Sequence, residues 1–177
     1  MTMLAYLLVL FAVVFRLVTE ASALNFAPVA AALLFFGSRM PRRQAWVPVA
    51  ALIASDVILT TRVYGYPLRP DQIVIWAWYL AIVLLGSLLA GRAKMWRIAG
   101  ASLAASISFF LLSNFAVWAA WEMYPRTFQG LLACYAAAIP FFRNTAASDM
   151  LFTAAFFGIP AVVEMLRSRT ARKTLSV

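Results

Sequence analysis

The residues of this chain that could do chemistry are a few polar side chains set within long apolar runs. Asp56 lies inside one run, and Asp149 begins another. A carboxylate held in lipid costs about 2.5–3.5 kcal/mol by insertion scales, so each should face a cavity or a partner. Three amides are expected at the same depth, and together they predict a small, outward-facing polar pocket. These side chains are Asn25, Asp56, Asn114, Asn144 and Asp149.

Two aromatic side chains and one cation extend this pocket. Tyr64 and Trp118 flank expected outer loops, where they either stack on a planar ligand or belong to the aromatic belt of a membrane protein. Arg143 follows Pro140 and is expected at the outer mouth, paired with a carboxylate near Asp149. Interhelical hydrogen bonds remain the alternative explanation for every polar member. The full substrate-binding set is Asn25, Asp56, Tyr64, Asn114, Trp118, Arg143, Asn144 and Asp149.

Arg16, in the first apolar run, has two interpretations. Glu20 follows four residues later, a spacing at which the two side chains share a helix face and could neutralise one another. Alternatively, Arg16 faces a polar cavity, as intramembrane charges usually do.

The chain offers no recognisable catalytic set. It contains no His, and its one Cys, Cys134, cannot form an intramolecular disulfide and reads as a small apolar residue. No phosphate-binding loop is present, and Asp56 and Asp149 lie outside any intramembrane-protease motif. We therefore expect neither an enzyme nor a bound cofactor or metal.

The amino-acid composition indicates which class of protein this is. Of 177 residues, 65% are hydrophobic and only 12% are charged, whereas soluble domains are about 25% charged. The chain is therefore an all-α integral membrane protein with a single domain over residues 1–177. Its net charge of +9 indicates basic cytoplasmic loops rather than a nucleic-acid partner.

The chain consists of a series of apolar runs. Some are long enough to cross a bilayer, and others are shorter. The first run lacks the basic start and cleavage site of a signal peptide, so it is expected to remain as a helix. The expected spans are 3–19, 24–37, 45–61, 72–90, 98–121 and 149–166, with a short helix at 128–142 and a basic tail at 167–177.

The distribution of Lys and Arg decides whether 128–142 crosses. If it does not, ten basic residues lie on one side and four on the other; if it does, the division is seven and seven. Basic residues favour the cytoplasmic side, so we predict a six-helix bundle with both termini cytoplasmic. Segment 128–142, which ends near Pro140, then becomes a short outer-face or re-entrant helix that covers Asn114 and Asp149 as a lid.

Small residues recur at helical spacing, which lets membrane helices approach closely. They serve either internal packing or the docking of a partner. The stripes are Ala23-Ala27-Ala31, Gly86-Ala90 and Ala101-Ala105.

Several short segments carry a resemblance to a known family. They are Asn25–Ala30, Ser55-Asp56, Ser113–Trp118, Tyr124–Thr127, Leu131–Tyr135 and Pro140–Thr145. In these the chain resembles an uncharacterised family of bacterial membrane proteins described as transport proteins (DUF6580-like). Its size and helix layout are also similar to the S-components of energy-coupling-factor vitamin transporters, although the Ala-xxx-Ala docking stripe of their first helix is absent here.

The resemblance implies a substrate-binding protein of the bacterial inner membrane that takes up a vitamin-like or micronutrient-like small molecule. Its expected partners are that substrate, membrane lipid and an energising module or other membrane subunit, unless it acts alone. The alternative is a small scaffold or accessory subunit that packs on a larger membrane complex.

Overall fold

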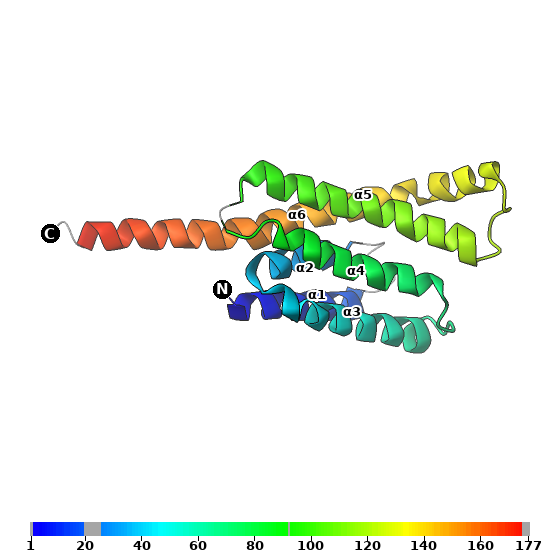
Figure 1. Ribbon diagram of the computed structural model, residues 1–177, viewed down its shortest axis with the longest axis horizontal. Coiled ribbons are helices and arrows are strands. Elements are labelled where there is room, and N and C mark those ends of the chain that lie inside the picture. Colours follow the sequence, from blue (N-terminus) through cyan, green and yellow to red (C-terminus); the bar gives the residue numbers. More distant parts are fainter. Residues whose placement is uncertain (1, 20–25, 92, 175–177) are drawn as a thin grey trace.

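The computed structural model describes residues 2–19, 26–91 and 93–174, which form an elongated bundle of six α-helices without strands (Figure 1). A 3-10 turn, η2, leads into α3, which continues into a π-helical turn, η3. The helices are α1 (Thr2–Thr19), α2 (Val29–Arg39), η2 (Arg42–Gln44), α3 (Trp46–Ile58), η3 (Leu59–Val63), α4 (Asp71–Ser87), α5 (Met95–Ala120) and α6 (Phe128–Thr174).

The ends of several helices follow local sequence. Pro70 immediately precedes α4, and Asp71 occupies its first turn, where a carboxylate interacts favourably with the helix dipole. Pro48 lies in the first turn of α3, where a proline removes no intrahelical hydrogen bond. The short helix α2 begins after Pro28 and makes no side-chain cap.

The central element is α2, which has only 11 residues and contacts α1, α4, α5 and α6. Residues 30–38 are all buried, as expected for a helix that is apolar on every side. Two glycines allow α4 to approach it closely. A Cβ atom on Gly37 would lie 2.0 Å from the Val83 carbonyl oxygen, and one on Gly86 would lie 2.4 Å from that of Leu34.

The small-residue stripes mostly serve this internal packing. Ala31, Gly86, Ala101 and Ala105 are buried, whereas Ala90 is exposed. Ala23 lies outside the described residues. The buried members do not form a bare surface on which a partner could dock.

The structure corrects the predicted short helix at 128–142. Residues 128–174 form one continuous helix, α6, of 47 residues, about 70 Å long at 1.5 Å per residue. The predicted lid is therefore the first third of α6 and runs antiparallel to the end of α5. The predicted span 149–166 is the middle of the same helix.

Pro140 lies inside α6 and does not end the helix. Proline removes one backbone hydrogen bond, but neighbouring helices can hold a transmembrane helix together across it. Here the Phe110 ring of α5 contacts Tyr135 at 5.4 Å and Phe142 at 4.9 Å between ring centroids, one on each side of the proline. These contacts keep the two parts of α6 in line.

Four helical segments are long and apolar enough to cross a membrane: 2–19, 42–63, 95–120 and 128–166. They indicate a multi-pass membrane protein. Shorter apolar helices, α2 and α4, complete the bundle.

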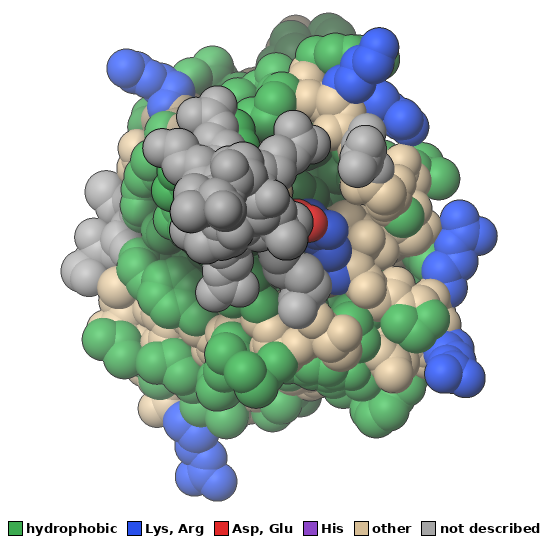
Figure 2. Space-filling model, turned by 90° about the vertical axis from the view of Figure 1, so that its left-hand side faces the viewer, with side chains coloured by type: hydrophobic (Ala, Val, Ile, Leu, Met, Phe, Trp, Pro, Cys, Tyr) green, Lys and Arg blue, Asp and Glu red, His purple; other side chains and the backbone are tan. Residues whose placement is uncertain are grey.

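The last part of α6 projects from one end of the bundle (Figure 1). Figure 2 looks onto this end and shows Lys and Arg side chains around its edge. The start of α1 and the end of α6 both lie toward it. Exposed cations from the connections on either side of η2 and before α5 are Arg39, Arg42, Arg43, Lys94 and Arg97.

Candidate functional site

Arg16 and Asp56 form an ion pair inside the bundle. Arg16 on α1 places its Nη2 atom 2.6 Å from Oδ1 of Asp56 on α3. The side chains are only 19% and 12% exposed, respectively. The pair ties together two helices that lie 40 residues apart in the sequence.

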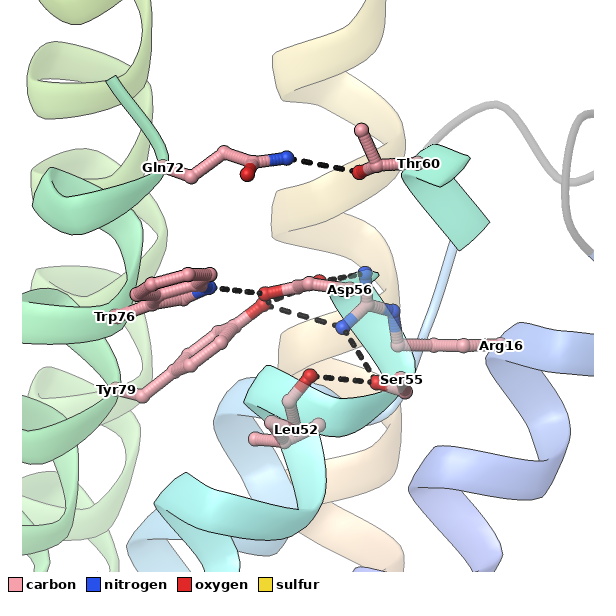
Figure 3. Close-up of polar contacts among 8 residues, drawn as sticks. All are labelled: Arg16, Leu52, Ser55, Asp56, Thr60, Gln72, Trp76 and Tyr79. Atoms are coloured by element: carbon pink, nitrogen blue, oxygen red, sulfur yellow. Dashed lines mark hydrogen bonds and ion pairs between the residues drawn. The ribbon is translucent and has the colours of Figure 1, made fainter. Parts of the chain in front are cut away.

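Helix α4 supplies two further hydrogen-bond donors to Asp56 (Figure 3). Tyr79 donates its hydroxyl to Asp56 Oδ1 at 3.2 Å, and Trp76 donates Nε1–H to Oδ2 at 3.1 Å. Arg16 Nη1 also donates to the Tyr79 oxygen at 3.1 Å and to Ser55 at 3.4 Å. Both carboxylate oxygens therefore accept hydrogen bonds, and we call these five residues the ion-pair network.

Asp149, on α6, has very different surroundings. The residue is 3% exposed, and its Oδ2 accepts a hydrogen bond from the Ser106 hydroxyl of α5 at 2.6 Å. One turn further, Thr153 donates to Ser102 at 3.2 Å. Within the described ranges the ion pairs are Arg16–Asp56 and Arg69–Asp71, and Asp149 belongs to neither.

A cavity of about 110 Å³ brings Arg16 and Asp149 to the same space. Helix α2 contributes its first residues, and the Ala27 carbonyl just before it accepts a hydrogen bond from Ser148 at 3.4 Å. The remaining wall is largely aromatic. The lining residues, which we call the polar cavity, are Arg16, Ala27, Val29, Ala30, Trp78, Tyr79, Phe109, Thr145 and Asp149.

A second cavity, of about 230 Å³, lies between α5 and α6. It shares Phe109 and Thr145 with the polar cavity, so the two adjoin. Asn114 and Ser113 are among its polar residues, and Phe110 and Phe142 provide aromatic surface. We call this space the aromatic cavity.

The predicted site residues separate into distinct places. Asp149 lines the polar cavity, and Asn114 lines the aromatic cavity while its side-chain amide donates to the Phe110 carbonyl at 2.8 Å. Asp56 borders the polar cavity only through its partners Arg16 and Tyr79. Asn25 lies outside the described residues.

The two predicted stacking residues belong to the outer turns and line neither cavity. Tyr64 is 44% exposed, just after η3. Trp118 donates Nε1–H to the Pro125 carbonyl at 2.9 Å, and the Arg126 guanidinium lies 5.8 Å from its ring centroid. Trp118 therefore helps to close the turn between α5 and α6.

Arg143 is exposed on α6 and takes part in neither of the two ion pairs in the described part of the chain. The predicted pairing of Arg143 with a carboxylate near Asp149 is therefore wrong. The reason is geometric: in a continuous helix Arg143 lies six residues before Asp149, about 600° of rotation, and so points to a different side. Asn144 is partly buried and lines neither cavity.

The sequence-based set omitted four residues that build the site: Arg16, Trp76, Trp78 and Tyr79. Arg16 was detectable, because an arginine within an apolar run needs a polar neighbour. The structure follows the second interpretation of Arg16, that it faces a cavity. The aromatic residues were hidden among many that suit an interfacial belt, and nothing in their spacing marked Tyr79 as a partner of Asp56.

Cys134 is buried, and its sulfur lies 3.5 Å from the Asn114 carbonyl oxygen, in a helix–helix contact. In the described ranges no three His, Cys, Asp or Glu side chains come together as a metal site would require. The described contacts of the site are hydrogen bonds and the Arg16–Asp56 ion pair.

The chain belongs to a family described as "Family of unknown function (DUF6580)", which matches residues 1–172. No curated protein and no solved structure matches the chain.

Proposed function

We propose that this member of the DUF6580 family is a substrate-binding membrane protein for the uptake of a small molecule, and that the polar cavity is its binding site. The observation that carries the proposal is the meeting of Arg16 from α1 and Asp149 from α6 in one space inside the bundle. Charged groups within membrane segments are costly and usually mark substrate or ion pathways. A cavity that keeps two of them is therefore difficult to explain by packing alone.

The buried stripes of small residues support uptake over a scaffold role. A scaffold needs a bare face of small residues, whereas Ala31, Gly86 and Ala105 are used within the bundle. The short helix α2 also fits a transport protein. Interrupted helices at membrane depth occur where the backbone is buried or lines a cavity, and Ala27 and Val29 line one here.

The proposal includes six crossings in a bacterial inner membrane, with α2 and α4 as short crossings and both termini in the cytoplasm. The exposed Lys and Arg residues around η2 and before α5 support that orientation. The proposal also includes an S-component-like architecture, in which the chain acts alone or with an energising module.

The projecting end of α6 favours a second candidate role, as an accessory subunit. Val162 and Leu166 are 50% and 53% exposed beyond the packed part of the bundle. A photo-crosslinker at Val162 should then capture a second membrane polypeptide, whereas one at Ile73, equally apolar and exposed, should not.

The test of uptake compares two threonine variants. Thr145 lines both cavities, and its hydroxyl bonds to the carbonyl four residues earlier; exposed Thr61 makes the same kind of bond but lines neither cavity. Thr145→Phe should fill the site, and Thr61→Phe is the matched control.

Each protein, in lipid nanodiscs, is dialysed against a metabolite extract, and bound molecules are identified by mass spectrometry. We expect a molecule retained by the wild type and by Thr61→Phe but not by Thr145→Phe. Equal retention by all three, or by none, would contradict the proposal.

A further inference from the structure

We infer that the ligand of the polar cavity is a zwitterion, a small molecule with one ammonium and one carboxylate group and an apolar substituent. The inference rests on the proposed function, because it names the class of molecule that the same cavity takes. It follows from three features: two opposite charges that do not meet, the donors that remain around Arg16, and the shape of the adjoining space.

The two charges of the cavity are separated from one another. Arg16 and Asp149 both line it, yet they do not form an ion pair. Arg16 is paired with Asp56, and in the described ranges neither ion pair includes Asp149. Among the residues that the structure describes, the Ser106 hydroxyl is the donor to this carboxylate. A buried carboxylate with so little compensation is suited to receive a cation.

The part of the cavity lined by Arg16 is suited to receive an anion. A guanidinium has five N–H donors, and three hydrogen bonds engage Arg16, so donors remain. Figure 3 shows the guanidinium held between Asp56, Tyr79 and Ser55, which fixes its position. Next to it the cavity is lined by Val29 and Ala30, the first residues of α2.

The start of α2 adds donors to that part of the cavity. The first N–H groups of a helix have no acceptor within the helix, and Pro28 provides no side-chain cap. They carry the positive end of the helix dipole. A carboxylate placed here would accept hydrogen bonds from backbone N–H groups and from Arg16 together. The ammonium group of the same molecule would then reach Asp149, and Thr145 could accept a second hydrogen bond from it.

The size of the cavities indicates what else the molecule carries. The polar cavity, about 110 Å³, has room for the charged head of an amino acid. The aromatic cavity, about 230 Å³, adjoins it at Phe109 and Thr145. Phe110 and Phe142 line that space, which therefore favours an apolar or aromatic substituent.

Three probes with the same phenyl ring test the two charged groups of the ligand one at a time. L-Phenylalanine carries both, phenethylammonium lacks the carboxylate, and 3-phenylpropionate lacks the ammonium. Binding of each radiolabelled probe to the protein in nanodiscs is measured by equilibrium dialysis. We expect phenylalanine to bind roughly tenfold or more tightly than either analogue. Phenethylammonium leaves the remaining donors of Arg16 and of the start of α2 without a carboxylate, and 3-phenylpropionate leaves Asp149 without a cation.

Asp149→Asn keeps the shape of the side chain and removes its charge. It should lower the affinity for phenylalanine roughly tenfold or more and leave that for 3-phenylpropionate unchanged. Glu164→Gln, an exposed carboxylate on the same helix, is the matched control and should change neither. If Asp149→Asn does not fold, Thr145→Val tests the ammonium side, and phenylalanine should again lose affinity more than 3-phenylpropionate does.

Each other result overturns the inference. Equal binding of phenylalanine and phenethylammonium would define a simple cation site, and equal binding of phenylalanine and 3-phenylpropionate an anion site. Both outcomes would leave the proposed function standing, since a small molecule still occupies the cavity. Binding of none of the probes would reject this ligand class, whereas the proposed function fails only in the Thr145→Phe comparison with the metabolite extract.

Discussion

Two buried carboxylates in this protein have opposite surroundings. Asp56 accepts hydrogen bonds on both oxygens, from Arg16, Tyr79 and Trp76, in a network that joins α1, α3 and α4. Among the described residues Asp149 accepts a hydrogen bond from Ser106, and it borders a cavity lined by residues of α1, α2, α4, α5 and α6. The contrast shows two uses of one residue type: the partly buried Asp56 holds helices together, and the buried Asp149 faces a cavity without an ion-pair partner among the described residues.

The packing around the two carboxylates also differs. On the side of Asp56, the neighbouring pair α2 and α4 is in near-backbone contact at Gly37 and Gly86. On the side of Asp149, small hydroxyl groups and aromatic rings line α5 and α6, and two adjoining cavities remain. We therefore expect substitutions in the first region to change stability and substitutions in the second to change binding.

The largest effect on stability is expected at the ion pair. Asp56→Asn leaves the Arg16 guanidinium without a counter-charge, which should cost about 3–5 kcal/mol in the free energy of unfolding. Denaturant unfolding in detergent micelles would measure it. The double variant Arg16→Met with Asp56→Leu should recover much of the loss, because neither member of the ion pair is then left without its partner. Wild-type stability of Asp56→Asn alone would remove the contrast between the two carboxylates.

The close contact of α2 and α4 should give the next largest effect. Gly86→Ala places a methyl group 2.4 Å from the Leu34 carbonyl oxygen, so the helices must separate. We expect a loss of about 1–3 kcal/mol, as for other overpacked cores. Gly100→Ala is the matched control, since a Cβ there meets nothing within 4 Å. Gly100→Ala should be neutral or stabilising, and equal melting temperatures for both variants would argue against the tight contact.

Asp149→Asn should change stability little and binding strongly. The amide still accepts the Ser106 hydrogen bond, and no ion pair is lost within the described residues. We expect the free energy of unfolding to stay within about 1 kcal/mol of the wild type, the ordinary range for such a change. Parallel measurement of unfolding and of retained small molecule would check both parts. A stability loss as large as that of Asp56→Asn would make Asp149 a structural group.

The smallest effect is expected at Arg143. Its side chain is exposed on α6 and belongs to neither of the described ion pairs. Arg143→Gln should therefore change the free energy of unfolding by less than about 0.5 kcal/mol and leave binding intact. Thermal unfolding and dialysis would show this. Loss of binding would instead place Arg143 in the site and extend it to the outer surface of α6.

The sequence by itself determined the class of protein and much of its layout. Long apolar runs are a local property, so α1, α3, α4 and α5 were found within a few residues of their ends. The exposed cations around η2 and before α5 do gather at one end of the bundle, as their spacing along the chain predicted. The sequence also predicted that Asp56, Asp149 and Arg16 need polar neighbours, because each is a charged residue within an apolar run.

Only the tertiary structure decided which groups meet. Arg16 pairs with Asp56, 40 residues away, because α1 and α3 lie side by side. Glu20, the candidate four residues after Arg16, lies outside the described residues. Pro140 predicts the end of a helix from local sequence alone. In the structure the helix continues through it, and Phe110 of α5 contacts Tyr135 before the proline and Phe142 after it. Local sequence specifies helices, whereas their rotation and neighbours depend on packing over the whole chain, and these fix the partners of each polar side chain.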